Sequence, residues 1–195
     1  MKPAQAQLHE VATVSLGITL RGADASRHDP EGTHQLIRIG DITEDGTLLP
    51  GAPNRIKLDA DTAHRSALHH GEVLLAARGN RMTAAVFDGA YPAVAGGQFL
   101  VIRPQEGVLL PGYLRWFLNL PSTQDSLAGR ARGSYVRSLP VSALAELDIL
   151  LPPLPRQAII TELHALRLRE KALMSTLAVR RATLIDQSLR LSLIA

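Results

Sequence analysis

The run from residue 156 to residue 195 contains neither glycine nor proline, and it constrains the fold more than any other stretch of the chain. Strong helix formers, chiefly Leu, Ala and Arg, fill this run. Pro152, Pro153 and Pro155 stand just before it, where the strand-like pattern of LDILLPPLPRQAII (147–160) ends. The sequence therefore predicts a rigid joint followed by one helix over 156–192, about 55 Å long. Such a helix is too long to pack wholly within a small domain.

The predicted helix carries apolar residues in a seven-residue frame. One row contains Ile159, Leu166, Leu173, Arg180 and Gln187, and its companion row contains Leu163, Glu170, Leu177, Leu184 and Leu191. Further apolar residues outside the frame make this face wider than a two-stranded seam. A stripe of this length needs a partner, which is either a second copy of the chain or a helix of another protein. The expected contact residues are Ile159, Leu163, Leu166, Leu173, Leu177, Leu184 and Leu191.

Residues 1–150 have a different pattern, with many glycines and short β-type runs separated by turns. We expect strands within 35–43, 71–80, 82–87, 97–104 and 146–152, and an Asp-Gly turn at 45–46. Pro111 opens a predicted helix that ends at Pro121, a further helical turn or two closes at Gly129, and a basic loop follows at 130–140. The predicted fold class is therefore α+β: a mixed, mainly β domain over 1–150, then the joint and the long helix over 151–195.

The charge and cysteine content narrow the function classes. The chain has 21 Lys and Arg residues against 18 Asp and Glu, and only Lys2, Lys57 and Lys171 are lysines. Guanidinium groups suit phosphate oxygens and guanine edges, although a G+C-rich coding bias toward Arg explains the excess equally well. Cysteine is absent, which excludes disulfides and thiol chemistry and fits a reducing compartment. Since no apolar run is long enough to cross a bilayer and no leader pattern is present, we expect a soluble cytoplasmic protein without a membrane partner.

The strongest candidate for an enzyme site is a group of ionisable residues, which comprises Asp59, Asp61, His64, His69, His70 and Glu72. Its spacing matches no HExxH-type metal motif, and we expect it to be a solvated loop before a strand. The sequence also lacks a GxSxG nucleophile motif, a GxGxxG or Walker A phosphate loop, and a glycine-rich methyl-donor motif. We therefore expect no catalytic residue, no metal and no cofactor. An enzyme with an unrecognised site over His64–Glu72 stays the least favoured alternative.

Basic residues near predicted turns are the better candidates. Arg78, Asn80 and Arg81 lie at the turn between two predicted strands, and the basic loop contributes Arg130, Arg132, Ser134, Tyr135 and Arg137. Arginine on a loop reaches base edges in the major groove, while hydroxyl and amide groups donate to phosphates. Aromatic residues make up only 4% of the chain, so the stacking platforms of single-strand binders are missing. This pattern favours duplex DNA as the ligand over a solvated loop.

Five blocks in one order resemble one half of a type I restriction–modification specificity (S) subunit. They are RIGDITEDGTLLP, LHHGEVLLAARGN, YPAVAGGQFLVIRP, PGYLRWFLNL and DILLPPLPRQAIITEL, and the last is the most specific. The resemblance implies a mixed α/β target-recognition domain that reads half of a bipartite DNA site, followed by a long helix that acts as spacer and docking element. Arg156 departs from the family pattern, because an acidic residue often precedes Gln157 there.

The resemblance also implies partners. A half-subunit with one recognition domain and one helix is expected to form a homodimer through 156–192 and to read a palindromic, bipartite target. It implies docking to a methyltransferase (M) subunit and, through it, to a restriction (R) subunit, so that this chain does no chemistry itself. A stand-alone DNA-binding or regulatory protein built from the same domain stays open as an alternative.

Overall fold

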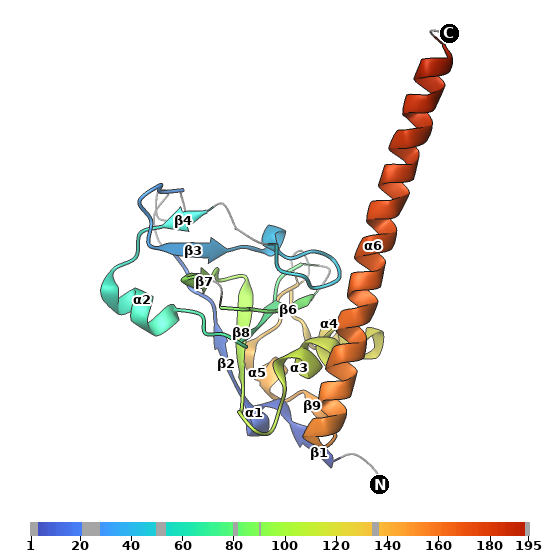
Figure 1. The fold of residues 1–195 in the computed structure, drawn as a ribbon. Helices are drawn as coiled ribbons and strands as arrows, with labels where there is room; N and C mark the ends of the chain where they lie inside the picture. The colour runs from blue at the N-terminus through green and yellow to red at the C-terminus, as the bar shows by residue number, and fades with distance from the viewer. Residues whose placement is uncertain are drawn as a thin grey trace.

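The computed structural model describes residues 4–20, 28–49, 54–79, 82–89, 91–133 and 137–193, which form a mixed α+β domain and one long helix (Figure 1). In chain order the elements are β1 (Ala4–Gln7), α1 (Leu8–Val11), β2 (Ala12–Leu16), β3 (His34–Ile37), the 3-10 helix η1 (Ile39–Asp41), β4 (Arg55–Ile56), α2 (Ala60–Ser66), β5 (Val73–Ala76), β6 (Ala84–Val86), β7 (Ala93–Ala95), β8 (Phe99–Pro104), α3 (Pro111–Leu118), α4 (Pro121–Arg130), α5 (Val141–Ala145), β9 (Asp148–Leu151) and α6 (Leu154–Ser192). The predicted fold class is confirmed.

The central sheet has four antiparallel strands in the order β2-β8-β5-β6. Successive residues of β5 point to opposite faces, so Val73 and Leu75 enter the larger core while Leu74 and Ala76 enter the smaller one. Burial on both faces explains why this strand reads as a continuous apolar run. The hairpin of β5 and β6 and the strand β8 confirm the predictions for 71–80, 82–87 and 97–104.

Two smaller sheets complete the domain. Strands β4, β3 and β7 form one of them, with β3 parallel to β7, and β1 pairs with β9 in the other. The predicted strand at 35–43 is shorter than expected, because the chain turns into η1 after Ile37. The Asp45–Gly46 turn is present, and Gly46 has a φ of 75°. A Cβ on Gly46 would lie 2.3 Å from the carbonyl oxygen of Ala84, so glycine is required there.

Helix α6 begins on the domain and then leaves it. The side chain of Gln157 is buried at the joint: its Oε1 accepts from the Leu110 N–H at 2.9 Å, and its Nε2 donates to the carbonyl oxygens of Val108 and Pro152, both at 2.9 Å. A Cβ on Gly112 would lie 2.2 Å from Thr161 Cγ2, so α3 and α6 approach closely. Beyond Lys171 every described residue of α6 is exposed, and this half projects past the domain (Figure 1).

Helix α6 is also the longest element, and its predicted start and end are confirmed to within a few residues. Charged residues alternate with apolar ones along its whole length. None of the described helices is both long enough and apolar enough to span a membrane.

Candidate nucleic-acid interface

The two basic clusters predicted from the sequence lie side by side. The segment that follows strand β5 pairs with residues 137–139: the Gly79 N–H donates to the carbonyl oxygen of Arg137 at 3.1 Å, and the Leu139 N–H donates to the Ala77 carbonyl oxygen at 2.9 Å. On its other side, the segment 137–139 pairs with Arg132, which exchanges two backbone hydrogen bonds with Ser138. Two neighbouring segments of the basic loop are thereby joined edge to edge with the segment after β5, which lies far from them in the sequence.

Arg78, Arg132 and Arg137 are the exposed arginines of this surface. Their guanidinium groups make no hydrogen bond or ion pair with any residue that the structure describes. Cations that neither pair nor pack within the protein are free to bind an anionic ligand. We call Arg78, Arg132 and Arg137 the arginine cluster. Asn80, Arg81, Ser134 and Tyr135, which were predicted for the same site, lie outside the described residues.

Arg130 does not belong to the arginine cluster. Helix α4 continues through Gly129 to Arg130, so the predictions that Gly129 closes the helix and that Arg130 lies on the loop are wrong. A Cβ at Gly129 would meet no atom within 4 Å, so nothing in its surroundings requires glycine there. The half-buried Arg130 Nη1 lies 3.4 Å from the carbonyl oxygens of Ala143 and Glu146 in and after α5. Its guanidinium therefore faces carbonyls at the end of another helix.

Two side-chain amides that sequence reasoning missed hold the hairpin from its outer edge. Asn119, at the end of α3, pairs with both backbone groups of Ala84, at 2.9 and 2.8 Å. Gln124 of α4 pairs in the same way with Met82, and its Nε2 also donates to the Leu118 carbonyl oxygen at 2.6 Å. The amides take the place of a neighbouring strand along β6, which is the edge of its sheet. They fix the position of the turn that carries Arg78.

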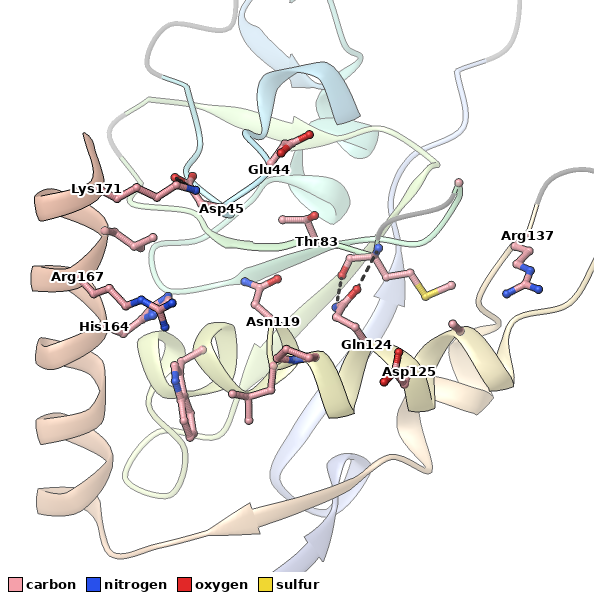
Figure 2. Close-up of a pocket in the computed structure, with 17 residues that line it drawn as sticks. Glu44, Asp45, Thr83, Asn119, Gln124, Asp125, Arg137, His164, Arg167 and Lys171 are labelled. Atoms are coloured by element: carbon pink, nitrogen blue, oxygen red, sulfur yellow. Dashed lines mark hydrogen bonds and ion pairs between the residues drawn. The ribbon is translucent and has the colours of Figure 1, made fainter. Parts of the chain in front are cut away.

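A cavity of about 750 Å³ separates this hairpin from α6 (Figure 2). Its lining includes both signs of charge: Glu44, Asp45 and Asp125 against Arg137, Arg167 and Lys171. An ion pair crosses its rim, with Lys171 Nζ 3.8 Å from Asp45 Oδ2. Because these residues come from the loop after η1, from α4, from the basic loop and from α6, no local pattern in the sequence identifies the cavity.

His164 faces the cavity from α6, and its Nε2 has no hydrogen-bond partner among the described residues. Burial lowers the pKa of His164, and the neighbouring positive charges of Arg115 and Arg167 lower it further. Asp45 behaves differently: the hydrogen bond from the Thr43 hydroxyl, with a contribution from Lys171, lowers the pKa of its carboxyl group. Burial and the charges of these two arginines therefore favour the neutral form of His164.

We expect the stability of the protein to decrease as the pH falls below 6.5, the ordinary pKa of histidine. The unfolded chain then takes up a proton at position 164 that the folded chain takes up only at lower pH, so protonation favours unfolding. Asp45 makes no contribution in this window, because its pKa lies below its ordinary value of 3.8. Urea unfolding of the wild type and of His164→Gln, from about pH 8 to about pH 5, measures the effect. The variant should have the flatter profile, and parallel profiles would refute this role of His164.

The ionisable residues at 59–72, the weaker candidate for an enzyme site, do not line this cavity. The expected loop contains a helix, α2, with Asp59 as its N-cap accepting from the Thr62 N–H at 2.8 Å. The prediction that Glu72 is solvated is wrong, because the residue is buried. Its Oε1 accepts from Arg103 Nε at 2.8 Å, and its Oε2 accepts from the His69 N–H at 2.9 Å. Its carboxylate joins β5 to β8. Among the described residues no group of three His, Cys, Asp or Glu side chains is arranged to hold a metal ion.

No protein-family description matches the sequence, and no curated protein matches it. Solved structures do match the fold. A chain of a type I restriction–modification (R-M) system, from a structure of its complex assembly and conformational transition, superposes on 88% of this chain with a TM-score of 0.65 and 17% identity. The HsdS subunit from Thermoanaerobacter tengcongensis superposes on 87% with a TM-score of 0.60 and 17% identity. The type I restriction–modification S subunit from M. genitalium superposes on 93% with a TM-score of 0.61 and 15% identity.

The chain spans 39%, 38% and 46% of those three chains, which is less than half the length of each. The superposed part covers 87% or more of the present chain. The resemblance to S subunits that the five sequence blocks predicted is therefore confirmed at the level of the fold.

Proposed function

We propose that this chain recognises duplex DNA in a sequence-specific manner, as the specificity subunit of a type I restriction–modification complex that reads half of a bipartite site. The observation that carries the proposal is the arginine cluster: three exposed guanidinium groups on adjoining backbone segments, with no partner among the described residues, in a fold shared with S subunits. Arginine donates two parallel hydrogen bonds to guanine or to a phosphate. A firmly held hairpin can therefore present these groups to a groove without large ordering costs.

The proposal divides the chain into two parts. Residues 1–150 read DNA, and residues 151–195 act as spacer, dimerisation element and docking site. The chain contributes no catalytic residue and needs no cofactor, because the methyltransferase subunit supplies the chemistry. A cytoplasmic location is part of the proposal, since the target is cellular DNA.

Two apolar surfaces of α6 support the proposed partners. The stripe defined by Ile159, Leu163, Leu166, Leu173, Leu177, Leu184 and Leu191 is exposed along its whole length, and we assign it to a second copy of the chain. A second apolar row, Met174, Ala178, Ala182, Ile185 and Leu189, lies on another face of the projecting half and is exposed as well. We assign this second row to the methyltransferase subunit and, through it, to the restriction subunit. Exposed apolar area of this extent is characteristic of protein interfaces.

Replacing Arg78, Arg132 and Arg137 together by Ala should weaken binding to the target duplex strongly. Each lost base contact costs about 1–3 kcal/mol, and each lost phosphate contact costs less. The dependence of affinity on salt should also decrease, by a slope of about one for every phosphate contact removed. The target comes from a selection on random duplexes, and titrations at several salt concentrations then give both quantities.

Arg65 provides the control, because it is also exposed and belongs to α2, which lies on another part of the domain (Figure 1). Arg65→Ala should keep the wild-type affinity. Wild-type affinity in the triple variant would refute the arginine cluster as the DNA-binding site. Equal losses in the triple variant and in Arg65→Ala would indicate only a loss of general positive charge.

A further inference from the structure

The wall of the cavity that α6 provides carries no acidic side chain. Four residues of α6 line the cavity: His164, Arg167, Leu168 and Lys171. The carboxylates of the lining come from the domain instead, two from the loop after η1 and one from α4. Figure 2 shows Arg167 and Lys171 on the α6 side of the cavity and Arg137, a member of the arginine cluster, on the opposite side. Cations therefore lie on both sides of the cavity.

The two cations of the α6 wall differ in their partners. Lys171 Nζ lies 3.8 Å from Asp45 Oδ2, so a carboxylate offsets its charge. The guanidinium group of Arg167 is exposed and makes no hydrogen bond or ion pair with any residue that the structure describes. Arg167 therefore resembles the members of the arginine cluster, and it is free to bind an anionic ligand.

The pKa of His164 shows where the positive charge is concentrated. Burial lowers this pKa, and the charges of Arg115 and Arg167 lower it further. None of these contributions comes from a carboxylate, so within the described residues the acidic groups of the cavity do not cancel the positive charge beside His164. Like charges held together without a counter-ion destabilise the folded protein. A phosphate group beside Arg167 would relieve this repulsion.

We propose that Arg167 binds a backbone phosphate of the duplex, across the cavity from Arg137, so that the first half of α6 belongs to the DNA-binding surface. The inference rests on the proposed function and extends its site from the domain to the helix. The cavity volume of about 750 Å³ exceeds that of a single phosphate group, so a sugar–phosphate strand can enter between the two arginines. Inorganic phosphate has the same chemistry, but the continuity of the cavity with the arginine cluster favours DNA.

A phosphate contact from α6 has a mechanical consequence. Phosphate contacts fix the register and orientation of a protein on the duplex, but they carry no sequence information. Since Arg137 belongs to the domain and Arg167 to the helix, a strand held by both ties the direction of α6 to the direction of the duplex. Arg167 therefore orients the helix on the DNA and does not determine which bases are read.

Removing the guanidinium group tests the contact. In the full chain, Arg167→Ala should lower the affinity for the target duplex roughly fivefold and reduce the salt dependence by a slope of about one, as expected for one lost phosphate contact. Discrimination between the target and single-mismatch duplexes should stay unchanged. Arg167→Lys should recover part of the affinity, because it keeps the charge but loses the planar fork.

Arg169 provides the matched control, because it is an exposed arginine of the same helix turned about 160° away from Arg167. Arg169→Ala should keep the wild-type affinity, and circular dichroism checks that each variant is folded. Wild-type affinity in Arg167→Ala, or an equal loss in Arg169→Ala, would overturn the inference and leave the arginine cluster as the proposed site.

Uncharged methylphosphonates, placed one at a time in the target duplex, locate the contact. They should weaken wild-type binding at the phosphates held by the arginine cluster and at one further phosphate. Arg167→Ala should be insensitive at that further phosphate only, because the contact is already lost. If Arg167→Ala keeps the complete wild-type pattern, α6 does not touch the DNA. A wild-type chain that prefers no selected duplex would overturn the proposed function as well.

His164 reports on the same phosphate, because its ring lies beside Arg167. Binding of the target duplex should raise the pKa of His164, since a phosphate offsets the neighbouring positive charges. The NMR signals of the histidine ring, followed against pH with and without the duplex, measure this change, and His164→Gln assigns the signals. An unchanged pKa in the wild-type complex, or the same rise with inorganic phosphate alone, would overturn the assignment of this site to DNA.

Discussion

Replacing Gln157 by Ala should lower the free energy of unfolding by about 3 kcal/mol. The side chain is 1% exposed, and its amide completes hydrogen bonds to Leu110, Val108 and Pro152. Removing it leaves one backbone N–H and two carbonyl groups without partners, and each buried unsatisfied group costs about 1–3 kcal/mol. The three groups together would cost about 3–9 kcal/mol, and partial relaxation and entry of water bring the total to about 3 kcal/mol. Urea unfolding monitored by circular dichroism measures the change.

Gln105 supplies the control, because it is an exposed glutamine of the domain outside the partner-binding rows of α6. Gln105→Ala should change the stability by less than about 0.5 kcal/mol. Equal unfolding curves for the two variants would show that the joint does not depend on the buried amide.

The same substitution has a functional consequence under the proposed role. The hydrogen bonds of Gln157 join the first turn of α6 to the segment just before α3, so they fix the angle at which the helix leaves the domain. A DNA selection with Gln157→Ala should recover the same half-site bases but a wider range of gaps between the two half-sites. This outcome separates a loss of spacing from a loss of base recognition.

The sequence predicted those elements whose pattern is local. The long helix, the hairpin of β5 and β6 and the strand β8 follow from helix propensity, β-type runs and turn residues, which act over a few neighbouring positions. The sequence did not predict that the turn after β5 lies beside the basic loop, because this pairing joins segments about sixty residues apart along the chain. The sequence therefore identified the three arginines of the cluster one by one, but it did not predict that they lie close together.

The errors have physical causes. Gly129 suggested a helix end because glycine is common there, but an exposed glycine inside a helix costs only about 1 kcal/mol. Glu72 was expected in solvent because carboxylates are mostly exposed, whereas Arg103 and the His69 N–H satisfy both of its oxygens. Asn119 and Gln124 gave no signal, since amide side chains are as common on surfaces as in buried hydrogen bonds, and Gln157 was noticed only as part of the fifth block of the resemblance. Their role becomes visible only when the backbone groups that they satisfy are known.

Asn119 and Gln124 lead to the second large effect, at the candidate interface itself. Asn119→Ala removes both partners of the Ala84 backbone, and Gln124→Ala removes both partners of the Met82 backbone. We expect each variant to lose about 2 kcal/mol of stability, since water can replace part of the lost hydrogen bonding at a sheet edge. Asn119→Asp is the sharper variant, because it keeps the acceptor for the Ala84 N–H but places an oxygen against the Ala84 carbonyl.

The consequence for recognition distinguishes a positioning role from a merely structural one. Without these amides the turn that carries Arg78 loses its support on the outer edge of β6, so the arginine cluster is no longer held in one geometry. At a temperature where the variants remain folded, DNA affinity should fall and discrimination between the target and single-mismatch duplexes should decrease. Amide hydrogen exchange should become faster at Ala84 in Asn119→Ala and at Met82 in Gln124→Ala, while β8 stays protected. Gln105→Ala, an exposed glutamine elsewhere on the domain, should change none of these quantities. If both amide variants bind DNA with wild-type affinity and discrimination despite the faster exchange, the outer edge of β6 does not position the cluster.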